Sequence, residues 1–297
     1  MRNSAVSNQT KNRIDLHLHS SLSDGENTVA EIIELAHKEG MKIIALTDHN
    51  LFAITKRIVT GDGDLEVIPG CEFSCTYKVP AWNDIAEIHV IGLFPDGVDP
   101  DAFTDVFSGI AEGKLDYVRA ILAKLETLGI HISMDEVMKE QRKTGHIGRH
   151  QIGDVLIRKG FANTIDEAFD RFVGNFSPHY IPATRFVKYA NMDVVVKKIK
   201  EEHGLPILCH PFGYSMNMEE IDELVKNFSD AAEGIGGIEV YYECYLDDAE
   251  RMQFLYELQM KYGLLPSAAS DRHRSDQPFA TRGDHSLYQD MVRLIQR

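Results

Sequence analysis

Short apolar segments alternate with longer amphipathic segments along most of the chain. The short segments are rich in Ile, Val and Leu, as buried parallel strands are. They span residues 14–18, 42–47, 66–72, 87–94, 206–209, 237–241 and 264–269. Helical patterns at residues 28–40, 191–203 and 247–262 separate several of them. This alternation predicts an α/β protein with a parallel sheet, and about seven strands predict a closed barrel.

Residues 105–185 break the alternation, because they contain helical patterns and no convincing strand. Capping-box sequences begin at Ser133 and Thr164, and glycines end several of the helical stretches. We therefore expect a helical insert over one end of a barrel that is formed by residues 13–104 and 186–297. A helical linker with only a structural role is the alternative. The polar residues 1–12 are expected to form a flexible tail.

Composition limits the partners and the compartment. The chain of 297 residues carries a formal net charge of −15, which disfavours binding to long duplex nucleic acid. It has no apolar run near the ~20 residues that a membrane span requires, so no membrane association is expected. Four cysteines in a chain of this length do not form a disulfide framework, and reduced thiols indicate a cytoplasmic protein. Cys71 and Cys209 are interpreted as packing residues and not as nucleophiles.

Histidines and carboxylates occur where the predicted strands end. Residues at the carboxyl ends of barrel strands converge on one mouth, so side chains that are distant in sequence should meet there. The candidate donors are His17, His19, Asp24, His49, Glu72, His89, His210, Asp271 and His273. Imidazole nitrogen combined with carboxylate oxygen suits zinc, manganese or iron, whereas calcium prefers oxygen alone. Nine donors are too many for one ion, so two or three divalent transition metals are implied.

The segments DLHLHSSLSDG, ALTDHN, PGCEF, LCHP and SDRH, with the lone His89, together resemble the polymerase-and-histidinol-phosphatase (PHP) family. The resemblance extends from about Arg13 to the C-terminus. It implies a distorted (β/α)7 TIM-like barrel, the PHP fold, with three metals. The implied ligands are His17, His19, Glu72 and Asp271 for the first ion, bridging Glu72 with His89 and His210 for the second, and Asp24, His49 and His273 for the third.

The insert segments IAEGKLDYVRAILAKLETLGI and GRHQIGDVLIRKG resemble one branch of that family. The branch contains nucleoside 3′,5′-bisphosphate phosphatases, 5′–3′ exoribonucleases and cyclic-phosphate hydrolases. We therefore expect a metal-dependent phosphoesterase that acts on a small phosphorylated metabolite, a nucleotide or sugar phosphate, through attack by a metal-bridging hydroxide. The alternatives are an exoribonuclease on short RNA, a cyclic phosphodiesterase, a histidinol phosphatase and a metal-binding regulatory module without turnover.

A second set of residues is predicted to take part in catalysis or in substrate binding. His210, His273 and Asp271 are the candidate catalytic residues, with a metal-bound water favoured over either histidine as the general acid. Arg149 begins an insert helix and is a candidate phosphate ligand.

The chain also departs from the pattern of that branch in three places. Ser177 stands where a lysine is common, the segment HPFGY lacks the basic residue that often follows the histidine, and Arg272 stands where an aromatic residue is usual. We expect Arg272, or Arg185 or Lys188, to replace the missing positive charge at the substrate.

Overall fold

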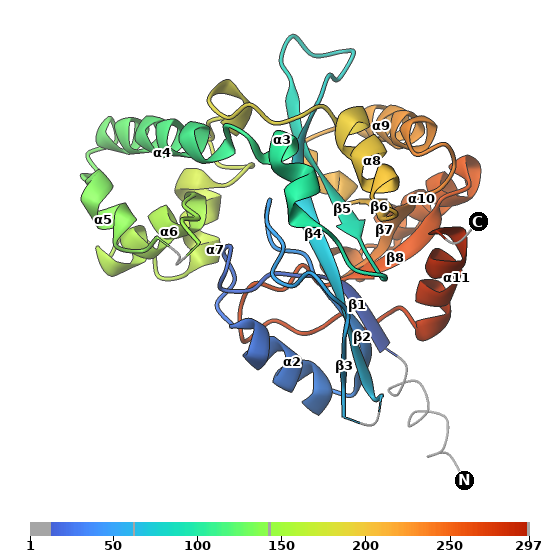
Figure 1. The fold of residues 1–297 in the computed structure, drawn as a ribbon. Coiled ribbons are helices and arrows are strands. Elements are labelled where there is room, and N and C mark those ends of the chain that lie inside the picture. The colour runs from blue at the N-terminus through green and yellow to red at the C-terminus, as the bar shows by residue number, and fades with distance from the viewer. Residues whose placement is uncertain (1–12, 62, 142–143, 296–297) are drawn as a thin grey trace.

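The computed structural model describes residues 13–61, 63–141 and 144–295, so the expected tail at residues 1–12 lies outside the described residues (Figure 1). One sheet forms the centre of the molecule. In spatial order its strands are β1 (Arg13–Leu18), β2 (Met41–Leu46), β4 (Leu65–Tyr77), β5 (Ala86–Leu93), β6 (Leu205–Leu208), β7 (Gly237–Tyr242) and β8 (Leu265–Ala269). The short strand β3 (Ile58–Thr60) pairs with the first half of β4.

The sheet closes where the end of β8 meets β1. The backbone N–H of Asp271 donates to the carbonyl oxygen of His17 at 3.0 Å, and the N–H of His19 donates to the carbonyl oxygen of Arg272 at 3.1 Å. These two bonds join the ends of the first and last strands at the rim. The predicted fold class, a distorted TIM-like α/β barrel, is confirmed.

The expectation that all strands run parallel was wrong for β5, which is antiparallel to both β4 and β6. The apolar pattern placed the end of the preceding strand at Glu72, but β4 continues to Tyr77. Only residues 78–85 then remain as a connection, and a parallel crossover needs about a dozen residues or more. The chain therefore turns back as a hairpin, and His89 lies within β5 opposite Ser74.

Helices pack on the outside of the barrel and at its lower end (Figure 1). They are α2 (Val29–Lys38), α8 (Met192–Glu201), α9 (Met218–Ala231), α10 (Ala249–Tyr262) and α11 (His285–Ile295). The expected helices at 28–40, 191–203 and 247–262 correspond to α2, α8 and α10, and the Thr28–Glu31 capping box is present. Along β2, Ile43 and Ala45 face one apolar cluster with β1 and β6, while Ile44 and Leu46 face α2. This period-two alternation separates the barrel interior from the helical layer.

The stretch expected to be helical folds as α3 (Thr104–Phe107), α4 (Ile110–Glu126), α5 (Met134–Met138), α6 (Arg149–Arg158) and α7 (Ile165–Ala168). Short 3₁₀ helices are η2 (Pro100–Phe103), η4 (Ala183–Arg185), η5 (Pro211–Tyr214) and η6 (Glu243–Tyr245), and η3 (Phe169–Val173) is a single turn of π-helix. Helices α4 to α7 have an apolar core of their own, in which Val118 and Ile152 are fully buried. The boundaries at 105 and 185 stay a prediction. No helix in the described ranges is long and apolar enough to cross a membrane.

A few polar contacts hold this helical stretch against the barrel. Arg274 forms an ion pair with Asp166, with nitrogen–oxygen distances of 3.0 and 3.2 Å. The side-chain amide of Asn175 donates to the carbonyl oxygen of Gly213 at 3.3 Å, and the hydroxyl of Thr144 donates to the carbonyl oxygen of Leu22. Each contact joins the helical stretch to a loop at the barrel mouth, so the helices lie beside the ends of the strands.

Three strand ends carry a residue with positive φ. Asn50, His210 and Asp271 have φ values of 53°, 24° and 54°. Only glycine adopts this left-handed region without steric cost, although Asn, Asp and His tolerate it better than other residues. All three positions lie at or directly beside candidate donors, so the backbone leaves its strand where the site begins.

Asp48 shapes the loop that carries Asp24. It is fully buried, and its carboxylate accepts hydrogen bonds from the backbone N–H and the hydroxyl of both Ser20 and Ser23, at 2.5 to 3.1 Å. Four donors compensate a buried charge, so this carboxylate fixes the loop against the end of β2.

We predict that Asp48→Ala lowers the free energy of unfolding by roughly 3 kcal/mol, because it leaves buried donors without an acceptor. Urea unfolding followed by circular dichroism measures this change. The matched control is Asp64→Ala, which alters an exposed aspartate beside the β3–β4 turn and should be close to neutral. Equal stability of the two variants would contradict the prediction.

Candidate metal centre and active-site cavity

Glu72 of β4 lies at the centre of the barrel mouth, with only 1% of its surface exposed. Its Oε2 atom is 3.3 Å from His17 Nε2, 3.2 Å from His19 Nε2 and 2.9 Å from His49 Nδ1. The first two histidines are two residues apart on the end of β1, and their Nε2 atoms approach to 3.0 Å. The alternation along the strand therefore brings both imidazoles to one point, as the sequence predicted.

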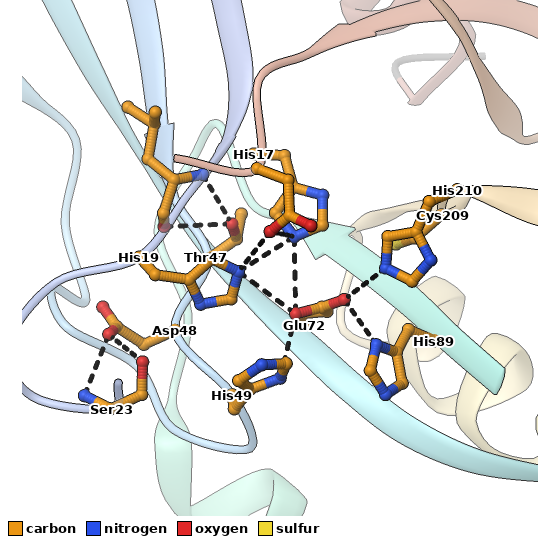
Figure 2. A network of polar contacts seen from close by, with 12 residues as sticks. His17, His19, Ser23, Thr47, Asp48, His49, Glu72, His89, Cys209 and His210 are labelled. Atoms are coloured by element: carbon orange, nitrogen blue, oxygen red, sulfur yellow. Dashed lines mark hydrogen bonds and ion pairs between the residues drawn. The ribbon is translucent and has the colours of Figure 1, made fainter. Parts of the chain in front are cut away.

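The other carboxylate oxygen of Glu72 faces two further histidines. Oε1 lies 2.7 Å from His89 Nδ1 and 3.0 Å from His210 Nε2 (Figure 2). The second ring nitrogen of His89 lies 3.6 Å from the carboxylate of Glu87, which is two residues away on the same face of β5. One carboxylate thus connects imidazoles from β5 and from the end of β6.

Asp271 completes the group around His17 and His19. Its Oδ1 atom lies 3.4 Å from His17 Nε2 and 3.1 Å from His19 Nε2. Its Oδ2 atom accepts a hydrogen bond from the hydroxyl of Tyr242 at 2.8 Å. The tyrosine at the end of β7 therefore holds the carboxylate with one oxygen toward the two imidazoles.

A second carboxylate group lies beside the first. Asp24 Oδ1 is 3.3 Å from His273 Nε2, and Asp24 Oδ2 is 3.5 Å from His49 Nε2. His19 Nδ1 also lies 3.6 Å from Asp24 Oδ1. Donor atoms of His19, Asp24, His49 and His273 all lie within 4.8 Å of one another. The structure therefore brings together all nine residues that the strand-end pattern singled out.

This donor set fits divalent transition-metal ions. The Nε2 atoms of His17 and His19 face each other at hydrogen-bond distance, although both can present a lone pair. His19 Nδ1 and Glu72 Oε2 are buried without a hydrogen-bond partner in the described part of the chain. Buried polar atoms normally have such partners. Neutral imidazole with carboxylate is a donor mixture that zinc, manganese and iron accept.

Charge balance shifts the pKa values of these groups strongly. Burial raises the pKa of Glu72, but the surrounding imidazoles outweigh it and hold the pKa well below the usual range. Burial lowers the pKa of His19 and of His89, but neighbouring carboxylates outweigh it and raise these pKa values to about 10 and about 9. In the absence of cations, protonated imidazoles therefore compensate the buried carboxylates.

Glu239 of β7 is a site residue that the sequence reasoning missed. Its Oε1 atom lies 2.7 Å from His17 Nδ1, and its Oε2 atom accepts from the backbone N–H of His210 at 2.7 Å. It is fully buried in β7, and the list of candidate donors from the strand ends did not include it. A carboxylate inside an apolar strand was the available signal, because such a charge needs partners when it is buried.

A cavity of about 390 Å³ lies between these donors and the helical stretch. Two cationic side chains line it. Arg149, at the beginning of α6, donates to Asn175 Oδ1 at 2.5 Å, and its guanidinium lies over the rings of Phe169 and Tyr180. Lys114 of α4, which sequence reasoning missed, is the other. The cavity thus has donors for cations on one side and these two cations, with the carboxylate of Glu87 near them, among its other lining residues.

The structure does not bring Arg272 to this cavity. Its side chain is buried, and its guanidinium donates to the carbonyl oxygens of Gln277 and Ser275 and to Asn27 Oδ1. It holds the loop after β8 instead of facing substrate. Arg185 pairs with Asp84 at 3.1 Å, and neither it nor Lys188 is among the described residues that line the cavity.

Two histidines that the sequence analysis did not select also line the cavity. His146 and His150 come from the segment that begins α6. Burial lowers the pKa of each to about 3, so both are neutral near physiological pH. The cysteines behave as expected for packing residues, because Cys71 and Cys209 are fully buried and burial raises their thiol pKa values well above the usual range.

Comparisons with known proteins agree with this geometry. The model of the PHP domain family matches residues 15–176, so the chain belongs to this family. As a member of it, the protein is a metal-dependent phosphoesterase.

Several curated relatives cover almost the whole chain. A 3′,5′-nucleoside bisphosphate phosphatase of Chromobacterium violaceum is 28% identical over 88% of this chain and 87% of its own. A 5′-3′ exoribonuclease of Haemophilus influenzae is 27% identical over 88% and 90% of the two chains. A phosphoribosyl 1,2-cyclic phosphate 1,2-diphosphodiesterase of Eggerthella lenta is 24% identical over 87% and 93%. The resemblance to this branch is therefore confirmed.

Solved structures share the fold. The structure of an amidohydrolase from Chromobacterium violaceum, with bound sulfate and no metal, superposes with a TM-score of 0.75 at 24% identity over 95% of this chain and 96% of that chain. A metal-dependent phosphoesterase from Bifidobacterium adolescentis gives a TM-score of 0.72 at 21% identity over the same shares.

We predict that Glu239→Gln weakens metal binding by about 10- to 100-fold, because the carboxylate that orients His17 and the start of the β6–η5 turn is lost. Calorimetric titration of the metal-free protein with Mn²⁺ measures the affinity. Glu257→Gln, an exposed change on α10, is the control and should bind as the unaltered protein does. Undiminished affinity in Glu239→Gln would argue against the positioning role.

We further predict that metal uptake releases protons at about pH 7.5. The raised pKa values of His19 and His89 mean that both rings are protonated in the metal-free protein, and a ring must be neutral to bind a cation. The release should fall as the pH rises through 9 to 10, because these rings then lose their protons before the metal binds. Titrations in buffers of different ionisation enthalpy count the protons. Uptake without proton release at the lower pH would contradict the assignment.

Proposed function

We propose that the protein hydrolyses a phosphate ester of a small phosphorylated metabolite, a nucleotide or sugar phosphate, with two or three bound ions of manganese, zinc or iron. The observation that carries the proposal is the arrangement around Glu72, whose two oxygens face imidazoles from the ends of β1, β2 and β6 and from within β5. A cavity of about 390 Å³ opens directly on this group and suits a small ligand.

The nine donors divide into three overlapping groups. His17, His19, Glu72 and Asp271 would hold one ion, Glu72 with His89 and His210 a second, and Asp24, His49 and His273 a third. When bound, such ions supply positive charge that polarises a phosphoryl group and lowers the pKa of water near neutral pH.

The surrounding residues hold the imidazoles in the tautomer that metal binding requires. His17 Nδ1 donates to Glu239, and His273 Nδ1 donates to the carbonyl oxygen of Asp271 at 2.8 Å. Each ring therefore presents the lone pair of Nε2 to the carboxylates of the site. Since His273 is engaged at both nitrogens, we favour a water molecule over this histidine as the proton donor to the leaving group.

The insert supplies the opposite wall. Lys114 and Arg149 line the cavity and provide charge for a phosphate that is not the one being cleaved. The aromatic rings beneath Arg149 restrict its guanidinium, which lowers the entropy that it loses when it binds an anion. Helices α4 to α7 would act as a lid that limits substrate size.

The main test is a substrate screen of the manganese-loaded protein. We expect it to release inorganic phosphate from at least one small phosphorylated metabolite in a panel that includes nucleoside 3′,5′-bisphosphates and cyclic phosphates. Glu72→Gln should abolish the release. A loaded protein that hydrolyses nothing in the panel, or a Glu72→Gln variant with full activity, would overturn the proposal.

A 5′–3′ exoribonuclease acting on short RNA is the second candidate, because relatives of 25 to 27% identity that cover 88% of the chain bear that name. The products separate the two functions. A short 5′-phosphorylated RNA yields nucleoside monophosphates under the second function, whereas inorganic phosphate is released under the first.

We predict that Arg149→Ala raises KM by about 10- to 100-fold for a substrate with two phosphate groups, because one charged hydrogen-bond partner is lost. The matched control is Arg158→Ala, at the other end of α6, where the arginine pairs with Glu140 at the surface. Steady-state kinetics with a bisphosphate and a monophosphate substrate measure the effect, which should be smaller for the monophosphate. An equal KM for the Arg149 and Arg158 variants would contradict the role of Arg149.

A further inference from the structure

His150 lies beside the carboxylate group at the edge of the barrel mouth, although it belongs to the insert. It is the second residue of α6, it lines the cavity, and its Nε2 atom is 3.8 Å from Asp24 Oδ2. The same carboxylate oxygen lies 3.5 Å from His49 Nε2. Asp24 therefore faces imidazole nitrogen from both the barrel and the insert.

Neighbouring rings fix the orientation of His150. Its imidazole is nearly parallel to that of His273, with ring centroids 5.2 Å apart and an angle of 6° between the planes. Phe169 also packs against it, with centroids 4.8 Å apart. The side chain is 22% exposed, so packing on both sides leaves it few alternative positions.

The spacing of these atoms suits a shared ion. Ligand atoms that surround a transition-metal ion at about 2.1 Å lie about 3.4 Å apart in a tetrahedral shell. Asp24 Oδ1 lies 3.3 Å from His273 Nε2, and Asp24 Oδ2 lies 3.5 Å from His49 Nε2 and 3.8 Å from His150 Nε2. Both imidazoles thus approach the same carboxylate oxygen at nearly the spacing of two ligands of one ion.

We propose that His150 is a further protein ligand of the ion held by Asp24, His49 and His273, so that this ion joins the insert to the barrel mouth. The inference rests on the proposed function, because it needs a cation at this group. It assigns the insert a part in metal binding in addition to enclosing substrate. Removal of this ion would then loosen the beginning of α6, where His150 is placed against Asp24.

The competing role for His150 is that of a hydrogen-bond donor, either to Asp24 or to a phosphate oxygen. His150→Gln distinguishes the roles, because a glutamine amide still donates a hydrogen bond but is a poor ligand for transition metals. Asp24→Asn is the positive control for loss of the ion. His131→Gln is the matched control, since that histidine is exposed on the insert and pairs with Glu126.

The experiment is a titration of the metal-free full chain with Co²⁺, read by visible absorption and by elemental analysis after gel filtration. We expect His150→Gln and Asp24→Asn each to lose at least tenfold in affinity for one ion, with an altered cobalt spectrum, and His131→Gln to match the unaltered protein. Hydrogen exchange provides a second measurement. Cobalt should protect the amides of α6 in the unaltered protein and fail to do so in His150→Gln.

Unchanged cobalt affinity, spectrum and α6 protection in His150→Gln would overturn the inference, even if this variant hydrolyses substrate more slowly. In that case the proposed function stands, provided that the unaltered protein binds cobalt and hydrolyses substrate. If the unaltered protein binds no cobalt, both the inference and the proposed function fail.

Discussion

A single buried carboxylate organises the mouth of this barrel. Glu72 lies within 3.3 Å of imidazole nitrogens from His17, His19, His49, His89 and His210. Buried carboxylates among neutral imidazoles carry negative charge without a partner, which is strongly unfavourable. The arrangement is therefore stable only if protons on the imidazoles or bound cations balance that charge. The strand order, the β4–β5 hairpin and the supporting carboxylate of Glu239 all serve to bring these groups to one point. The chemistry of the protein follows from that charge balance.

The sequence predicted much of the centre because eight of the nine donors lie at or just after the ends of the predicted strands, where a simple topological rule applies. Side chains at the carboxyl ends of barrel strands converge, and apolar runs before His17, His49, Glu72 and His210 locate those ends. His89 was found by residue type and not by this rule, since it lies inside an antiparallel strand. Its position became understandable only when β4 proved to extend to Tyr77. An apolar pattern gives the presence of a strand more reliably than its end or its direction.

The residues that the sequence left undetermined depend on how the insert and the loops pack. Lys114 and His150 lie on helices whose faces look amphipathic, and nothing local tells which face turns toward the cavity. Arg272 was selected but does not reach the cavity. It lies between the candidate ligands Asp271 and His273, yet its guanidinium turns into a loop and donates to backbone carbonyl oxygens there. Glu239 could have been found by asking what compensates a carboxylate within an apolar strand.

The left-handed backbone at His210 and Asp271 makes the turns that carry these two side chains energetically costly. Each residue is held in a conformation that costs on the order of 1 to 3 kcal/mol for a residue other than glycine. Glycine would relieve that cost but has no side chain to bind an ion. Glycine at position 271 would also leave the buried imidazoles of His17 and His19 without one of their carboxylate partners. Because a buried charge without its partner is destabilising, this loss offsets the relief of the backbone, and the strained turn is retained together with the side chain that it presents to the site.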